Sequence, residues 1–372
     1  MIIRIATKPE NKLGYETREI KPDGVTPSLP KKSTLLITPM LPLPKITLAL
    51  PVLNEERDIG RCLESIHKQD YPRELLEVIV ADGGSTDRTE EIVRSYGYRF
   101  LHNPYKLAEP GGAMAYAAAT GDLFIHLAAD NELRERNWLM EMAQPFLADK
   151  NIVGAFCRVE CNPGDNAFLK YFNFDTDPFS AFVYWNASHP ETFGQRYPVK
   201  KDTGAYVIYQ FDTQYYPLVA LAQGFVVRRT FPRPTDTIHD DIQPIVRMIK
   251  DGHDLAYVRT VTIGHYIFDN FAHYRRRMLR KVSESFTQAN HGFHVREKAL
   301  PWPRRLRQYL FVPWALTVIG PFFSALGRFF RTGHWHHFYH VPASFLLAAY
   351  ILRMALEVRL LKLRKAPTGQ YH

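Results

Sequence analysis

The chain has 372 residues, 46% of them apolar and 13% aromatic, and a formal net charge of +9. This composition excludes general intrinsic disorder, and the length predicts a domain of ordinary size with additional elements. The three cysteines, Cys62, Cys157 and Cys161, give no CxxC pair and no even-numbered framework. We therefore expect ordinary thiols in a reducing compartment.

The positive charge is concentrated in the C-terminal part of the chain. Residues 271–372 contain 17 Lys and Arg against 3 Asp and Glu, whereas residues 1–270 contain 30 against 35. A basic segment of this kind can face nucleic acid or anionic lipid. Because no nucleic-acid-binding motif is present and long uncharged stretches separate the basic residues, we expect membrane lipids as partners and no nucleic acid.

An extended arm is expected at residues 1–44, which are polar, irregular and without a signal-peptide pattern. Beyond them, short apolar runs alternate with helical patterns, which predicts an α/β fold with a mostly parallel sheet covered on both faces. Strands are expected at residues 46–50, 77–80, 99–102, 122–127, 152–159 and 224–227. Helices are expected at residues 87–97, 111–119, 138–147 and 245–250, and after an N-cap at Asn54.

Polar residues directly follow three of these strands. Asn54 and Glu55 come after the first strand, which Pro51 ends, Asp82 follows the second and Asp130 follows the fourth. Ligands bind beyond the carboxyl ends of the strands in such sheets. Each residue taken singly is most often a solvated loop residue or a helix cap, but together they predict a binding site.

An aromatic-rich segment at residues 162–223 interrupts the alternation of strands and helices. Spacings of three and four residues are typical of a buried helical core. A wall that receives an apolar or sugar-like acceptor is the alternative, and both interpretations stay open. The aromatic residues are Phe168, Tyr171, Phe172, Phe174, Phe179, Phe182, Tyr184 and Trp185.

A second polar cluster is expected further along the chain. Asp240 and Asp241 lie near the N-terminus of the helix at 245–250, where the helix dipole favours ionised carboxylates. Gly252 ends that helix, and the following strand carries His265 back toward the two carboxylates. This span predicts half of an active site.

The residue types indicate group transfer from a nucleotide-activated donor. Asp82, beside glycines, can accept hydrogen bonds from a base or a ribose. Asp130 and His265 are too few to close a coordination shell, which suits Mg²⁺ or Mn²⁺ bridging a diphosphate. Asp241 is placed to remove a proton from an attacking hydroxyl, with inversion if displacement occurs in one step.

Two long uncharged stretches end the chain, 19 residues at 309–327 and 21 residues at 332–352 that include four histidines. A membrane span needs about 20 apolar residues. A hairpin with both ends cytoplasmic agrees with the flanking Arg and Lys residues. Broken helices lying in the membrane interface, or a buried soluble helix pair, are the alternatives.

Four strings along the chain resemble, in order and spacing, the signatures of family 2 glycosyltransferases with the GT-A fold. The resemblance covers roughly residues 45 to 270 and implies an inverting transfer of a sugar from a nucleotide-sugar, with a divalent metal. The strings are ALPVLNEERDI at 49–59, VIVADGGSTDRT at 78–89, the PGGA turn at 110–113 before GDLFIHLAADNEL at 121–133, and the span 240–265.

The resemblance also implies roles for individual residues. By this resemblance, Asp130 and His265 bind Mg²⁺ or Mn²⁺, and Asp241 is the catalytic base. Asp240 stands where the family usually has Glu. The resemblance further implies that UDP- or GDP-sugar binds at Pro51, Asn54, Glu55, Asp82, Gly112, Asp130 and Arg276. For the arginines at 275–277, contact with phosphate on a lipid acceptor, or the start of a membrane-facing surface, are the alternatives.

The sequence departs from the family pattern at Ala128, where the family has the first of two acids that straddle one residue. We expect weaker donor binding as a result, unless the run Asp130-Asn131-Glu132 supplies a shifted substitute. Residues 274–281 read YRRRMLRK and lack the QxxRW motif of processive synthases, which favours transfer of a single sugar.

The sequence thus predicts a GT-A catalytic domain at 45–270, with 162–223 as an acceptor-side insertion, a basic connecting segment at 271–303 and membrane-associating helices at 304–372. The predicted function is sugar transfer to a lipid-linked saccharide or polyprenyl phosphate at the cytoplasmic face of the cell membrane. A catalytically weak nucleotide- or lipid-binding scaffold is the alternative. A nucleotidyltransferase is less favoured, because its N-terminal turn would need a lysine that residues 51–57 lack.

Overall fold

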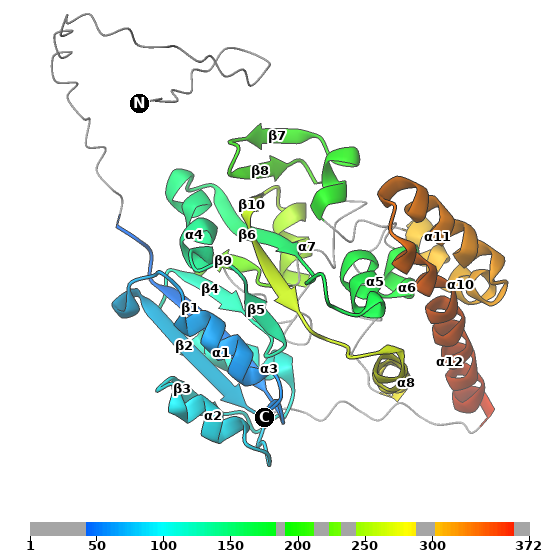
Figure 1. The fold of residues 1–372 in the computed structure, drawn as a ribbon, viewed down its shortest axis with the longest axis horizontal. Coiled ribbons are helices and arrows are strands. Elements are labelled where there is room, and N and C mark those ends of the chain that lie inside the picture. The colour runs from blue at the N-terminus through cyan, green and yellow to red at the C-terminus, as the bar shows by residue number, and fades with distance from the viewer. Residues whose placement is uncertain (1–41, 184–189, 212–222, 232–242, 288–301, 361–372) are drawn as a thin grey trace, which may run out of the picture. The chain divides into compact units, whose positions relative to one another are not determined.

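A computed structural model describes residues 42–183, 190–211, 223–231, 243–287 and 302–360 of the chain (Figure 1). The chain divides into two units, residues 1–42 and residues 43–372, and the described residues belong almost entirely to the second. The arm predicted at 1–44 lies outside the described residues except for its last three positions.

Ten strands form one mixed sheet in the order β3-β2-β1-β4-β9-β6-β10-β8-β7, with β5 paired to β10 beside this path. The parallel pairs are β1 with β2 and β4, β2 with β3, and β6 with β10. β5, β8 and β9 run antiparallel to their neighbours. The strands are β1 (Ile46–Val52), β2 (Leu76–Asp82), β3 (Arg99–His102), β4 (Leu123–His126), β5 (Asn131–Leu133), β6 (Ile152–Val159), β7 (Val199–Asp202), β8 (Tyr206–Tyr209), β9 (Val226–Arg228) and β10 (Asp254–His265).

Helices cover both faces of this sheet. Alternate residues of β1 face opposite sides: Leu48 and Leu50 join the core beneath α1, α2 and α4, while Ala49 packs against α3. The helices are α1 (Ile59–His67), α2 (Thr89–Ser95), α3 (Ala108–Ala118), α4 (Trp138–Ala148) and α7 (Gln243–Lys250). The α/β fold class predicted from the sequence is therefore confirmed. The prediction holds because apolar strands that are buried on both faces need helices on both sides of the sheet.

The predicted start of the first helix is wrong. α1 begins at Ile59 after Asp58, and Asn54 caps no helix but has a positive φ of 55°. Its side-chain oxygen accepts a hydrogen bond from the backbone N–H of Thr86 at 2.8 Å, in the turn after β2. Asn tolerates this left-handed backbone better than most residues, so the turn after β1 is tied to the turn after β2 instead of to its own helix.

The predicted end of the first strand is also wrong, because Pro51 lies inside β1. β4 pairs with β1 only as far as Ala49, so the missing N–H of Pro51 removes no hydrogen bond to that neighbour. The sequence does not predict β5 at all, because a strand of three residues shows no periodicity.

Most described aromatic side chains of the segment 162–223 lie in cores. This segment forms α5 (Ala167–Asp175), α6 (Pro178–Val183), the 3-10 helix η2 (Pro190–Gln195) and the hairpin β7–β8. Phe168, Tyr171 and Phe179 are 3%, 0% and 7% exposed, in agreement with the core interpretation. Tyr184 and Trp185 lie outside the described residues.

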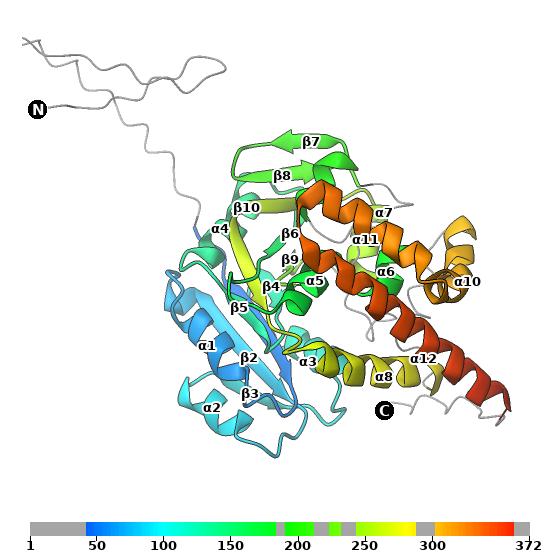
Figure 2. The same ribbon diagram turned by 45° about the vertical axis from the view of Figure 1, so that its right-hand side comes forward.

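The C-terminal helices dock on the same domain and are not a separate appendage. They are α8 (Phe271–Thr287), α10 (Trp302–Leu316), α11 (Ile319–Thr332), the 3-10 helix η4 (Trp335–Tyr339) and α12 (His340–Leu360). Phe311 of α10 and Leu347 of α12 are buried in one cluster with Phe156 of β6 and Tyr257 of β10. Figure 2 shows α12 running past α8 and α11 on this side of the sheet.

The uncharged stretch at 309–327 forms no straight span. A bend of 95° separates Arg305–Leu316 from Ile319–Thr332, so these two helices together give at most a broken span. Among the described residues, length and composition allow one helix, Trp335–Arg359, to cross a membrane. The bend agrees with the alternative of broken helices in the interface.

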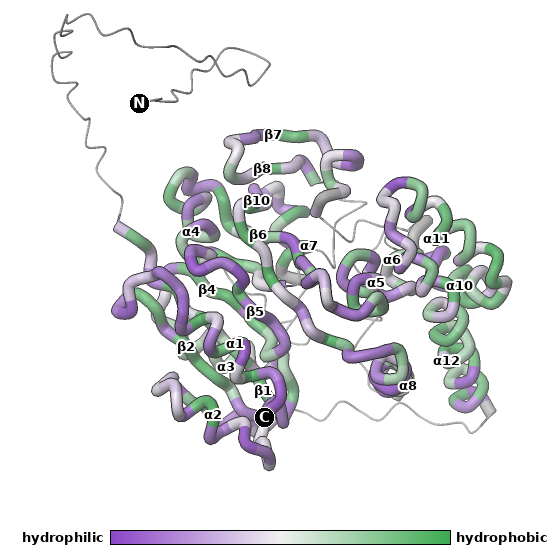
Figure 3. The backbone as a smooth tube through the Cα atoms, viewed as in Figure 1, coloured by the Kyte–Doolittle hydropathy of each residue, from purple (hydrophilic) through white to green (hydrophobic). Residues whose placement is uncertain are grey.

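Apolar side chains on the surface are concentrated in α10, α11 and α12, where the hydropathy colouring is largely apolar, whereas α8 is mostly hydrophilic (Figure 3). Of the large exposed hydrophobic residues that the structure describes, only Leu53 and Val199 lie outside the C-terminal helices, and Leu279 lies on α8. The others are Trp302, Leu306, Tyr309, Leu310, Val318, Ile319, Phe322, Phe323, Phe330, Trp335, Phe345, Leu352 and Leu356.

Candidate functional site

The short strand β5 brings Asp130 and His265 together. β5 pairs antiparallel with the end of β10, and Asn131 lies opposite His265 in this register. The backbone N–H of Tyr266 donates to the Asp130 carbonyl oxygen at 2.9 Å. As a result, Oδ2 of Asp130 lies 3.9 Å from Nε2 of His265, at the carboxyl end of the sheet. The two residues predicted to share a metal are thus neighbours.

The His265 ring is fixed from behind by Asn173 of α5. Oδ1 of Asn173 lies 2.9 Å from Nδ1 of His265, and Nδ2 of the same amide donates to the His265 carbonyl oxygen at 2.8 Å. An amide oxygen only accepts, so Nδ1 carries the proton and Nε2 presents its lone pair toward Asp130. Burial lowers the pKa of His265, partly opposed by Asp130, and a neutral imidazole is the form that binds metals.

Asp130 has unused hydrogen-bonding capacity. Within the described part of the chain, its buried Oδ1 atom has no hydrogen-bond partner. A buried carboxylate oxygen without a partner is costly, which is the condition that a bound cation relieves. Asp130 therefore fits the role of a metal ligand.

Glu55 is the third acid at this edge of the sheet. Burial, together with the negative charges of Asp130 and Asp58, raises its pKa to about 7, although Arg277 and Arg57 act in the opposite direction. A cation near these carboxylates would reduce their repulsion. Glu55 thus lies close enough to the predicted metal site for the charge of Asp130 to raise its pKa.

The residues present fit a hard divalent cation with open coordination positions. Among the described residues, no group of three or more His, Cys, Asp or Glu side chains is arranged to enclose a metal ion. Asp130 and His265 offer one oxygen and one nitrogen, and a Mg²⁺ or Mn²⁺ ion with so few protein ligands takes the others from a diphosphate and water.

Asp82 and Asn54 build the turns around this edge. The Asp82 carboxylate accepts hydrogen bonds from the backbone N–H groups of Gly84 and Ser85 at 2.8 and 2.9 Å, and from the Ser85 hydroxyl. Asp82 is only 3% exposed. Its carboxylate is thus already occupied within its own turn, and the predicted contact with a base or ribose would have to share or replace these bonds.

The two glycines at the start of α3 let that helix approach the ends of β1 and β4. A Cβ atom on Gly111 would lie 3.1 Å from Cβ of Pro51, and one on Gly112 would lie 3.0 Å from the His126 ring. Gly112 and Pro51, both predicted to bind the nucleotide-sugar, therefore pack at the same edge as the other candidates.

The positive charge of Arg277, the neighbour of the predicted Arg276, acts on Glu55 and His265. Arg276 is exposed on α8, whereas Arg277 is half-buried and influences the pKa of both Glu55 and His265. The sequence pattern could have indicated that Arg277 is half-buried. It lies three residues after the buried Tyr274 and directly before the buried Met278 of α8. The contact of Asn173 with His265 was harder to predict, because the sequence shows only a single amide within an aromatic-rich helix.

The residues around Ala128 do not supply a carboxylate at its position. The Ala128 backbone N–H donates to Oδ1 of Asn131 at 3.2 Å, and Oε2 of Glu132 accepts from the Tyr266 hydroxyl at 2.6 Å. The Asn131 side chain thus holds the turn before β5, and the Glu132 side chain links β5 to the residue after β10. Asp240 and Asp241, the predicted catalytic pair, lie outside the described residues.

Comparison with known families decides what kind of domain carries this site. Residues 47–207 match the family described as Glycosyl transferase family 2. The chain contains a family 2 glycosyltransferase domain. This match covers four of the five strands that deliver the candidate residues, and it confirms the family predicted from the sequence.

Curated relatives match short stretches of the chain. Glycosyltransferase AglE of Haloferax volcanii is 43% identical over 54 residues, which are 14% of this chain and 18% of that protein. A Methanococcus voltae protein is 43% identical over 49 residues, 13% of this chain and 15% of its own length. Its name is dolichyl N-acetyl-alpha-D-glucosaminyl phosphate 3-beta-D-2,3-diacetamido-2,3-dideoxy-beta-D-glucuronosyltransferase. The chain thus spans less than a fifth of the length of these relatives.

A solved structure is similar over a longer part of the chain. It is the mannosyltransferase PcManGT from Pyrobaculum calidifontis in complex with GDP-Man and Mn²⁺. The two chains are 16% identical, and the similarity covers 86% of this chain and 88% of that one with a TM-score of 0.45.

Proposed function

We propose that this protein is a metal-dependent inverting glycosyltransferase that moves a sugar from a UDP- or GDP-sugar to a lipid-linked acceptor. The observation that carries the proposal is the placement of Asp130 beside His265, with Glu55 nearby, where Asp130 and Glu55 lie within the region that matches family 2. In this function Asp130 and His265 would hold Mg²⁺ or Mn²⁺. When bound, the ion would neutralise charge on the departing nucleoside diphosphate.

The other residues would act on the substrates directly. Asp241, with Asp240 before it, would accept the proton of the attacking hydroxyl, and displacement from the opposite side of the sugar would invert its anomeric centre. Arg277, and Arg276 at the surface, would face the negative diphosphate. The turns that contain Pro51, Asn54, Glu55, Asp82 and Gly112 would surround the nucleotide.

A lipid-linked acceptor, such as a polyprenyl phosphate or a lipid-linked saccharide, is supported by the surface of the C-terminal helices. Of the large exposed apolar side chains that the structure describes, most lie on these helices, and residues 271–372 carry the basic excess. Such a surface favours contact with an anionic membrane. The name of the Methanococcus voltae relative, with its dolichyl phosphate, supports the same acceptor class. Orientation toward the cytoplasm rests on the basic residues that flank the apolar stretches.

Ala128 favours a second candidate function. Without the first acid of the family pair, and with Asn131 and Glu132 engaged elsewhere, the donor site has one carboxylate fewer. A protein of this kind could bind a nucleotide or lipid as an assembly partner without transferring a sugar.

Release of nucleoside diphosphate from UDP- and GDP-sugars, in the presence of Mn²⁺ and membrane lipid extract, tests both candidates. We expect release by the native protein and a loss of at least 100-fold in Asp241→Asn, while calorimetry shows that this variant still binds nucleotide. Asp251→Asn, on the surface after α7, is the matched control and should be unaffected. Binding without release for every donor and acceptor would favour the scaffold function instead.

A further inference from the structure

A cationic pocket lies between η2 and α11, and it is distinct from the Asp130–His265 cluster. Its volume is about 180 Å³, smaller than the roughly 300–1,000 Å³ typical of sites for drug-sized ligands. None of its lining residues belongs to the candidate donor site. They are Phe174, Asp175, Thr192, Gln195, Arg196, Arg328, Arg331 and Thr332.

The charge of the pocket is strongly positive. Among the described lining residues, three guanidinium groups face the single carboxylate of Asp175, and that carboxylate is already engaged. Oδ1 of Asp175 lies 3.0 Å from Nη1 of Arg328, and Oδ2 accepts a hydrogen bond from Nδ1 of His337 at 2.5 Å. Arg328 and His337 lower the pKa of Asp175 against the effect of its burial. Among the described residues, Arg196 and Arg331 therefore remain without a carboxylate partner.

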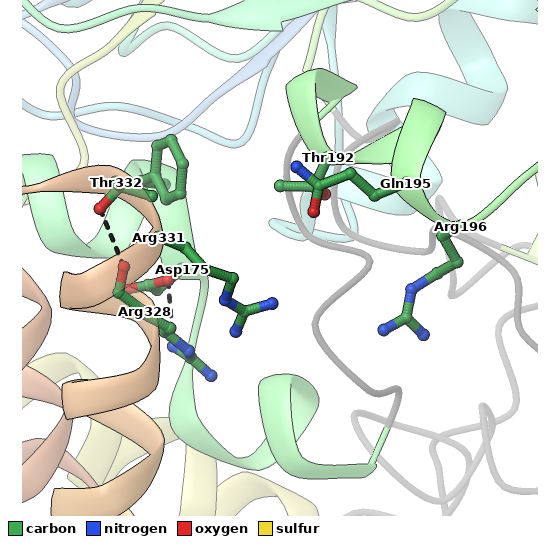
Figure 4. A pocket seen from close by; sticks show the side chains of 8 residues that line it. Asp175, Thr192, Gln195, Arg196, Arg328, Arg331 and Thr332 are labelled. Atoms are coloured by element: carbon green, nitrogen blue, oxygen red, sulfur yellow. Dashed lines mark hydrogen bonds and ion pairs between the residues drawn. The ribbon is translucent and has the colours of Figure 1, made fainter.

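These two arginines face the same space from opposite walls. Figure 4 shows the guanidinium of Arg331, from α11, and that of Arg196, after η2, directed into the pocket across from each other. Nε of Arg331 donates to the Gly327 carbonyl oxygen at 3.1 Å, which holds the side chain in place and leaves its terminal nitrogens for a ligand. Within the described residues, neither arginine forms an ion pair with a carboxylate.

Arg328 forms the floor of the pocket and fixes its shape. Its side chain is 7% exposed, and its carbonyl oxygen accepts a hydrogen bond from the Thr332 hydroxyl at 3.1 Å. Thr332 also contacts Nε2 of His337 at 2.7 Å. The backbone and side chains at the end of α11 are thus held by a buried polar network, so the pocket is formed before a ligand binds.

We propose that this pocket binds a phosphate group. Planar guanidinium groups that converge on a small space match the geometry of phosphate oxygens and bind them through paired charge-assisted hydrogen bonds. Thr192 and Gln195 line the same wall and can add neutral hydrogen bonds.

The surface beside the pocket indicates where the phosphate comes from. Phe330 directly precedes Arg331 in the chain, and Trp335 follows it by four residues. Their side chains are 75% and 60% exposed. Exposed aromatic residues beside arginines are typical of protein surfaces at the membrane interface. A phosphomonoester headgroup of an anionic lipid is therefore the expected source, with free inorganic phosphate as the other. The inference concerns binding alone and does not depend on sugar transfer.

The pocket can be tested with the full chain and two probes, inorganic phosphate and phosphatidylcholine vesicles with or without phosphatidic acid. We expect Arg196→Gln and Arg331→Gln each to weaken binding of the phosphatidic acid vesicles about tenfold at constant salt. Arg331→Lys keeps the charge but loses the paired hydrogen bonds, so it should also bind more weakly than the native protein. Arg328 is left unchanged, because breaking its buried pair with Asp175 would disturb the fold.

Arg136→Gln, at an exposed ion pair with Asp70 just before α4, is the control for loss of one charge. It should bind like the native protein, and all variants should have the native melting temperature without ligand. Competition by inorganic phosphate would show that the pocket takes the free ion as well, whereas vesicle binding without such competition would assign it to the lipid headgroup. Equal losses in Arg136→Gln and the pocket variants, or native binding in Arg196→Gln and Arg331→Gln, would overturn the proposal.

Discussion

The side-chain amide of Asn173 holds His265 by both its ring and its backbone, at 2.9 Å from Nδ1 and 2.8 Å from the carbonyl oxygen. Asn173 belongs to α5, whose last residue, Asp175, lines the pocket between η2 and α11. One short helix therefore positions the predicted metal ligand and forms part of the cationic pocket.

Replacing Asn173 with Ala should weaken the metal site while leaving the fold intact. The ring of His265 would lose the acceptor that selects its tautomer, and changes of this kind typically cost 10–100-fold in metal affinity. We expect Mn²⁺ binding, followed by electron paramagnetic resonance, to weaken at least tenfold. Asn151→Ala, in an exposed turn, should bind Mn²⁺ like the native protein. Unchanged affinity in Asn173→Ala would show that His265 does not bind the ion in this tautomer.

Acid should loosen the docking of the C-terminal helices through His336. Burial, and the neighbouring His337, lower the pKa of His336 to about 4, below its ordinary value of about 6.5. Between these values the unfolded state binds more protons than the folded state, so stability falls as the pH decreases. After solvent screening, the free energy of unfolding attributable to His336 should fall by about 1 kcal/mol from pH 7 to pH 5.

Urea unfolding at pH 7 and pH 5 measures this effect. His336→Gln removes the titrating group, so its stability should depend less on pH than that of the native protein. His67→Gln, at the exposed end of α1, is the control and should keep the native pH dependence. An identical pH dependence in all three proteins would contradict the assignment.

Substitutions of Phe311 and Phe323 should have different effects, because the first side chain lies on the buried face and the second on the exposed face of the C-terminal helices. Phe311 is fully buried, and Phe311→Ala should lower the free energy of unfolding by about 3 kcal/mol because it leaves a cavity. Phe323 is 63% exposed, so Phe323→Ala should leave stability unchanged and weaken binding to anionic vesicles. Denaturant unfolding and vesicle sedimentation measure the two effects. Strong destabilisation by Phe323→Ala would mean that this face is packed in the protein and is not a membrane contact.

Gly121 should tolerate no side chain. A Cβ atom there would lie 2.7 Å from the backbone nitrogen of Thr47 and 2.9 Å from the carbonyl oxygen of Leu123, and neither backbone group can move easily. We expect Gly121→Ala to destabilise the protein by about 2 kcal/mol in urea unfolding. Gly164→Ala, where the added atom would meet nothing within 4 Å, is the matched control and should be close to neutral.

The sequence alone determined the alternation of strands and helices, the family and the edge of the sheet where the site lies. Apolar runs such as 152–159 are local patterns, and β6 occupies those residues. Parallel strands place their carboxyl ends at one edge, so Glu55 and Asp130 could be assigned to a common site before any distance was known.

Only the tertiary structure decided which polar groups meet and which are already engaged. The contact between Asp130 and His265 depends on pairing of β5 with β10, across more than a hundred residues of chain. Likewise, Asp82 turned out to be bonded within its own turn, and the bend after α10 divided an apolar stretch that composition presents as continuous. Composition and periodicity report local preference, whereas these contacts arise from long-range packing, which residue types along the chain do not encode individually.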